Sequence, residues 1–84
     1  MKFAIVVSKK DPAGLNIKDK LLKYFTKTSE KFEDEFVYSY KNAKLYTVKK
    51  ESIFNEYIDK KINADFFIFA TKHQSKAKIN SLSL

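Results

Sequence analysis

Residues Lys2–Ser8 read KFAIVVS, an apolar run in which β-branched side chains follow one another. A half-exposed strand would alternate apolar and polar residues, so this run predicts a strand that is buried on both faces of a sheet. A second run, FFIFA at Phe66–Ala70, has the same character. We therefore expect two interior strands, Lys2–Ser8 and Phe66–Thr71, side by side and parallel in an α/β fold.

The residues after the first run predict a turn and then a helix. Asp11–Gly14 has the composition of a turn. Asn16, followed three positions later by Asp19, resembles a capping box, so we expect the helix to begin at Asn16. The apolar residues at helical spacing are Ile17, Leu21, Leu22 and Phe25, whereas Lys18, Asp19, Lys20 and Lys23 are expected to face outward.

Two alternating segments, Phe36–Tyr40 and Lys44–Lys49, predict a hairpin with a short turn. Thr26–Lys31 is expected to be a polar link, and Ser52 to cap a second helix that ends near Asn63. The expected order is β-α-β-β-α-β, which describes a single domain of residues 1–84 with a mixed sheet.

The composition of the chain limits the classes of protein that it can represent. It contains no cysteine, which excludes disulfide bonds and thiolate metal sites. The opening apolar run is far shorter than the roughly 18 residues of a membrane span, and no signal-peptide cleavage site follows it. We therefore expect a cytoplasmic protein without a membrane partner.

The net charge is +7, and all 17 basic residues are lysines. The positive excess lies towards the two ends: residues 1–29 hold seven lysines and two acidic residues, and residues 66–84 hold three lysines and none. This distribution fits binding to a nucleic acid, and it equally fits a solubilising surface. Three tyrosines, Tyr38, Tyr40 and Tyr46, could stack on bases, although cross-strand packing is the favoured interpretation.

The carboxyl ends of parallel neighbouring strands lie at one edge of a sheet, where α/β proteins bind ligands. The segments that leave this edge are Ser8–Asp11 and Thr71–Lys76. Both are basic, and the second contains His73, the only histidine. Ordinary solvated loops would have a similar composition, and no catalytic triad, zinc motif or phosphate-binding loop is complete in the chain.

The same two loops resemble motifs of the archaeal and plant type of D-aminoacyl-tRNA deacylase. DPAGLNI at 11–17 is similar to the family's Asp-x-Ala-Ser-x-Asn-Ile, and FATKHQSK at 69–76 is similar to its Ala-Ser-Arg-His-Ser-Ser-Lys. The similarity in element order and spacing covers essentially all 84 residues. The chain departs from the pattern at Gly14, where the family has Ser, at Lys72, where it has Arg, and at Gln74, where it has Ser.

This resemblance implies an enzyme of translation quality control that hydrolyses the ester between a D-amino acid and tRNA. It also implies a fold similar to phosphorylases and peptidyl-tRNA hydrolases, with zinc as a cofactor. His73 would lie at the ester as a base, a hydrogen-bond donor or a metal ligand, and it is the only candidate ligand; Ser75 would contact the oxyanion or the ribose. The residues expected to hold tRNA are Lys9, Lys10, Lys72 and Lys76, with Asn16 capping the nearby helix.

Members of that family are longer than this chain, and a His-x-Thr-Gly-Asn segment is expected to follow Leu84. Asn80–Leu84 alternates as the beginning of a strand would. We therefore expect the chain to be the N-terminal portion of a longer enzyme, inactive by itself and able to self-associate through uncovered edges. The alternative is a small basic module that binds RNA or a protein without catalysis.

Overall fold

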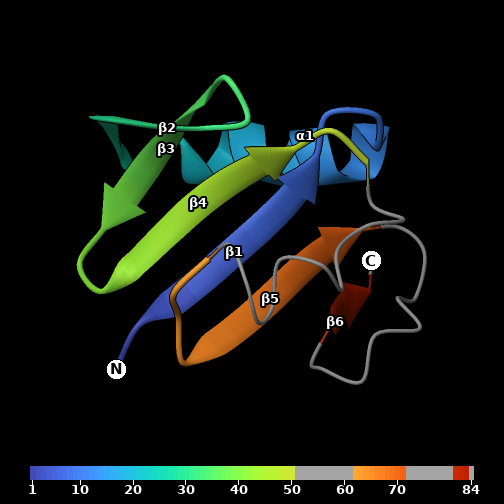
Figure 1. Ribbon diagram of the computed structural model, residues 1–84. Coiled ribbons are helices and arrows are strands. Elements are labelled where there is room, and N and C mark those ends of the chain that lie inside the picture. Colours follow the sequence, from blue (N-terminus) through green and yellow to red (C-terminus); the bar gives the residue numbers. More distant parts are fainter. Residues whose placement is uncertain (51–61, 72–80, 84) are drawn as a thin grey trace.

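The computed structural model describes residues 1–50, 62–71 and 81–83. Its strands form one mixed sheet in the order β2-β3-β4-β1-β5-β6 (Figure 1). The elements in chain order are β1 (Phe3–Ser8), α1 (Pro12–Leu21), β2 (Thr26–Phe32), β3 (Glu35–Tyr40), β4 (Ala43–Val48), β5 (Phe66–Thr71) and β6 (Ser81–Ser83).

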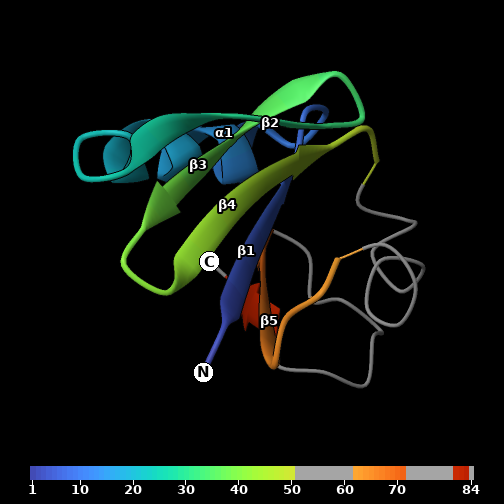
Figure 2. The same cartoon turned by 60° about the vertical axis from the view of Figure 1, so that its left-hand side comes forward.

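β1 lies at the centre of the sheet, between β4 and β5 (Figure 2). It runs parallel to both neighbours, and Val6 stands opposite Tyr46 of β4 and Phe69 of β5. β6 pairs in parallel with β5, whereas β3 pairs antiparallel with both β4 and β2. The prediction that the two apolar runs form adjacent parallel strands is confirmed, and so is the mixed α/β class.

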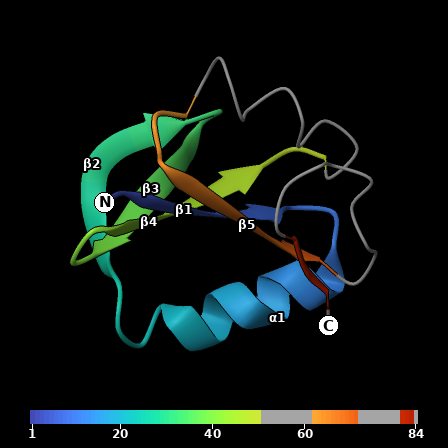
Figure 3. The ribbon, with the colours of Figure 1, turned by 90° about the horizontal axis from the view of Figure 1, so that it is seen from below.

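The side chains of β1 point alternately to two faces of the sheet, and both faces are covered. α1 lies along one face (Figure 3), where Ile17 and Leu21 pack against the buried cluster around Leu45. The buried cluster of the other face contains Ala4, Val6, Val37, Tyr46, Val48, Ile62, Phe67 and Phe69. Burial on both faces removes the need for polar positions, which explains the apolar sequence of β1.

The start of α1 differs from the sequence prediction. The helix begins at Pro12, and the Asp11 carboxylate caps it by accepting a hydrogen bond from the Ala13 backbone N–H at 3.1 Å. Asn16 therefore lies inside the helix, exposed, and the prediction that it is the N-cap was wrong. Proline suits the first helical position because its φ is already helical and it lacks an N–H that would need a partner. Asp-Pro therefore starts a helix here, although its composition is also typical of turns.

The segment from Thr26 to Phe32 is a strand, β2, where a polar link was expected. Its side chains are mostly exposed because β2 is the outermost strand of the sheet and pairs only with β3 on its inner side. The ammonium groups of Lys27 and Lys31 lie 3.9 and 4.8 Å from the centre of the Phe36 ring. A polar, lysine-bearing strand is typical of a sheet edge, where charge discourages pairing with another molecule.

The other predicted elements divide into those that are described and those that are not. The hairpin of β3 and β4 is confirmed, with Tyr40 opposite Ala43 and Lys41 at φ 54° in the turn. A strand at Ser81–Ser83 agrees with the alternation at that end of the chain. The predicted second helix lies outside the described residues, except for Ile62 and Asn63, which belong to no helix.

The cap assignment can be tested by two substitutions in the same helix. Asp11→Ala removes the acceptor for the Ala13 N–H, so it should lower the free energy of unfolding by about 0.5–2 kcal/mol. Asn16→Ala should leave the stability unchanged or raise it slightly, because alanine is the better helix former. Chemical denaturation followed by circular dichroism would measure both. Equal losses of stability for the two variants would contradict the assignment.

Candidate active site

The carboxyl ends of the parallel strands β4, β1 and β5 lie at one edge of the sheet, as predicted. Among the residues that the structure describes, the buried polar or charged ones are Ser8, Asp11, Thr47 and Thr71, and all four belong to this edge. Burying polar groups is costly unless they have hydrogen-bond partners, so their concentration sets this edge apart from the apolar middle of the sheet.

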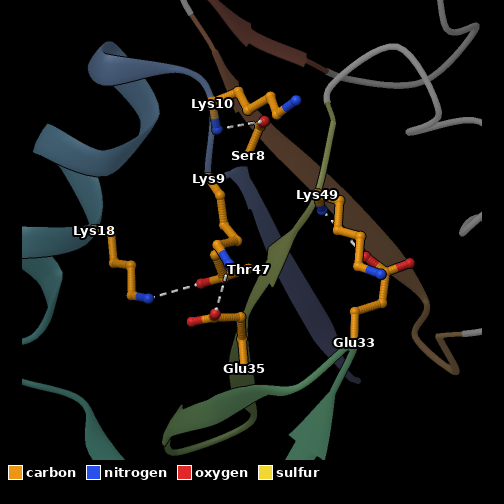
Figure 4. A network of polar contacts seen from close by, with 8 residues as sticks. All are labelled: Ser8, Lys9, Lys10, Lys18, Glu33, Glu35, Thr47 and Lys49. Atoms are coloured by element: carbon orange, nitrogen blue, oxygen red, sulfur yellow. Dashed lines mark hydrogen bonds and ion pairs between the residues drawn. The ribbon is translucent and has the colours of Figure 1, made fainter.

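The loop after β1 is held by its own polar groups. The Ser8 hydroxyl accepts a hydrogen bond from the Lys10 backbone N–H at 3.1 Å, and the Ser8 carbonyl accepts one from the Asp11 N–H at 3.2 Å (Figure 4). The Lys9 N–H donates to the Val48 carbonyl of β4 at 2.8 Å. This short loop is therefore fixed to the sheet while the side chains of Lys9 and Lys10 remain exposed.

Two glutamates approach the lysines of this edge, which the sequence did not indicate. The Lys9 ammonium forms an ion pair with the Glu35 carboxylate at 3.1 Å. The Glu33 carboxylate accepts a hydrogen bond from the Lys49 backbone N–H at 3.1 Å (Figure 4). Both acids come from the turn and strand of the β2–β3 hairpin, which reaches the edge only because β3 pairs with β4. Lys9 therefore already has an anionic partner, whereas Lys10 points to solvent.

Lys18 of α1 also reaches this edge, although it was expected to face outward. Its ammonium group donates a hydrogen bond to the buried Thr47 hydroxyl at 2.8 Å and lies 5.7 Å from the centre of the Tyr38 ring. The contact joins the helix to β4 across 29 positions of sequence. Sequence reasoning missed it because neither the helix start nor the place of β4 was known.

The two loops of the candidate site are connected through a close backbone contact. Gly14, in the first turn of α1, is buried, and a Cβ atom at this position would lie 2.9 Å from the Ala70 carbonyl oxygen of β5. A real side chain would push the helix and the strand apart, since the obstacle is backbone. The departure from the family pattern at Gly14 thus coincides with a place where no side chain fits.

The remaining predicted site residues, Lys72, His73, Ser75 and Lys76, lie outside the described residues. The residue before them, Thr71, is buried at the carboxyl end of β5. Within the described part of the chain, no group of three or more His, Cys, Asp or Glu residues could hold a metal ion. No helix in that part is long and apolar enough to cross a membrane.

Sequence comparison gives this edge a context. The chain is 32% identical to the D-aminoacyl-tRNA deacylase of Pyrococcus furiosus and 31% identical to those of Pyrococcus abyssi and Thermococcus onnurineus, in each case over 94% of its length. The resemblance to archaeal D-aminoacyl-tRNA deacylases is confirmed. The chain spans about a third of the length of these deacylases. No family model matches the sequence.

The contact between Lys18 and Thr47 should contribute to stability. Thr47→Val removes the acceptor of the Lys18 ammonium, and Lys18→Met removes the donor. In a double-mutant cycle measured by chemical denaturation, we expect a coupling free energy of about 0.5–1.5 kcal/mol. Lys20→Met in place of Lys18→Met is the control, because Lys20 is an exposed lysine of the same helix. Coupling of the same size with the control would contradict the assignment.

Proposed function

We propose that residues 1–84 correspond to the N-terminal portion of a deacylase that hydrolyses the ester between a D-amino acid and tRNA. The observation that carries this proposal is the similarity of 94% of the chain to proteins named D-aminoacyl-tRNA deacylase. The arrangement of the sheet agrees with it, because both motif loops leave the same edge. Such an enzyme would act in the cytoplasm, and its fold would be related to phosphorylases and peptidyl-tRNA hydrolases.

Hydrolysis of an aminoacyl ester needs an attacking water, a group that accepts its proton and donors that stabilise the oxyanion. We place His73 beside the ester and Ser75 at the oxyanion or the ribose, since both follow β5 within a few residues. Zinc, implied by the family resemblance, requires three or four ligands. The described residues supply no such group and the chain has one histidine, so no step of the reaction is assigned to zinc.

The lysines that leave the sheet edge are proposed to contact the phosphates of tRNA. Lys10 after β1 and Lys49 after β4 are exposed there, and Lys72 and Lys76 after β5 would extend the same patch. Lys9 would contribute less, because Glu35 already neutralises it. Each phosphate contact releases bound counterions, which makes affinity depend on salt.

The phosphate contacts can be tested by charge reversal. The variant Lys10→Glu/Lys49→Glu should weaken tRNA binding and reduce the slope of log affinity against log salt by roughly one for each phosphate that is no longer bound. The control Lys20→Glu/Lys23→Glu makes the same change in net charge on exposed residues at and after the end of α1. Fluorescence anisotropy at increasing KCl concentration would measure both. An equal reduction in slope for the control would show that only total charge matters.

The hydrolytic activity can be tested with D-tyrosyl-tRNA. We would compare the 84-residue chain with a chimera in which it replaces the matching third of the Pyrococcus furiosus deacylase. The chimera should release D-tyrosine and the short chain should not, because the short chain holds one histidine and no cysteine. His73→Ala in the chimera should slow hydrolysis by roughly 10²–10⁴-fold if the imidazole takes part in proton transfer.

L-tyrosyl-tRNA serves as the control substrate, and circular dichroism verifies that each protein is folded. Full activity of the His73→Ala chimera would remove the histidine from the mechanism. A folded chimera that binds tRNA without hydrolysing it would instead favour a basic RNA-binding module.

A further inference from the structure

A pocket of about 430 Å³ lies at the opposite edge of the sheet, near the amino ends of β1 and β4. It opens on the face away from α1, since Phe32 and Tyr46 in its wall belong to the buried cluster of that face. Pockets for small organic ligands typically measure roughly 300–1,000 Å³. This pocket therefore has the size of a binding site, and it is separate from the edge that bears the motif loops.

Backbone and side-chain hydrogen bonds hold the rim of the pocket in place. The Lys2 N–H donates to the Asp65 carboxylate at 2.7 Å, and the Lys2 carbonyl accepts from the Phe66 N–H at 3.1 Å. The Phe3 N–H donates to the Asn42 carbonyl at 3.0 Å, and the Asn42 amide donates to the Met1 carbonyl at 2.7 Å. The start of the chain is thus clamped between the β3–β4 turn and the beginning of β5.

Aromatic rings form part of the wall of the pocket. The rings of Phe32 and Tyr46 meet edge to face with centres 5.5 Å apart, and Phe3 stacks on Phe66 at 5.4 Å. Phe3 and Phe32 are half-buried, so each keeps some surface open, while Tyr46 is only 5% exposed. Aromatic surfaces of this kind are where nucleic-acid-binding proteins stack single bases.

The charge of the pocket is positive. Lys2, Lys41 and Lys44 line it together with Glu30, whose carboxylate lies 3.0 Å from the Lys44 ammonium. The hydrogen bond to Glu30 raises the pKa of Lys44, which therefore stays charged at neutral pH. Burial raises the pKa of Tyr46, so its phenol stays protonated and can donate a hydrogen bond. Three cations and one anion leave an excess of two positive charges for an anionic ligand.

We propose that this pocket binds one unpaired nucleotide of an RNA strand. The ammonium groups of Lys2 and Lys41 hold its phosphate, and the base lies against the Phe3 and Phe32 rings. A base inside a duplex cannot reach such rings, which is why the nucleotide must be unpaired. The site lies at the other edge of the sheet from the proposed ester-binding loops and does not depend on deacylase activity.

The test is a titration of the isotope-labelled 84-residue chain, followed by backbone amide resonances. The probes are a short single-stranded oligoadenylate, AMP and inorganic phosphate. The oligoadenylate should shift the amides of Phe3, Asn42 and Lys44 saturably, and AMP should shift the same amides more weakly. Inorganic phosphate over the same concentrations should not, because it has no base. Tighter binding of AMP than of the oligoadenylate would assign the pocket to a free nucleotide and overturn the RNA assignment.

Variants separate the pocket from general charge. Lys2→Ala/Lys41→Ala should weaken oligoadenylate binding roughly tenfold, and Phe3→Leu should have a similar effect because the base can no longer stack on an aromatic ring at this position. Lys20→Ala/Lys23→Ala removes the same charge outside the pocket and should leave the affinity unchanged. Equal weakening by this control, or equal shifts from a poly-glutamate peptide, would overturn the proposal. Shifts confined to Lys10 and Lys49 would reject it as well, while leaving the proposed tRNA patch intact.

Discussion

The structure depends on the burial of β1 between two parallel neighbours, with apolar side chains packed on both of its faces. Parallel pairing satisfies the backbone of β1, and the clusters on the two faces supply the hydrophobic free energy for the core. A polar residue in the middle of this strand would be buried whichever face it pointed to. The same arrangement directs three carboxyl ends, and the segments that follow them, to a single edge.

That strand arrangement also distributes charge to both ends of the sheet. The carboxyl edge combines exposed lysines with buried hydroxyl and carboxylate groups, and the glutamates of the β2–β3 hairpin partly neutralise it. The amino edge places lysines beside aromatic rings instead. A polyanion would find a cation at either end, but only the amino edge offers a wall of rings among the residues described.

The apolar runs were predictable because burial on both faces leaves a direct mark on composition, and the β3–β4 hairpin was predictable from alternation. The helix start was missed because Asp-Pro is common in turns and at helix starts alike, and the choice depends on whether Asp11 reaches the Ala13 N–H. β2 was missed because an edge strand needs no apolar pattern. Of the candidate site, the shared edge followed from parallel pairing. The pairing of Lys9 with Glu35 and the contact between Lys18 and Thr47 depend on strand order, which no local pattern contains.

The absence of a side chain at Gly14 has a mechanical consequence. The first turn of the helix rests directly on the Ala70 carbonyl, so the spacing between the β1–α1 loop and the end of β5 is set by two backbones. Side chains can change rotamer to take up a small displacement, but backbone in contact with backbone cannot. A shift of the helix start would therefore be passed on to the end of β5, and the bases of the two motif loops should move as one body. Any adjustment to substrates of different size would then take place farther out along the loops.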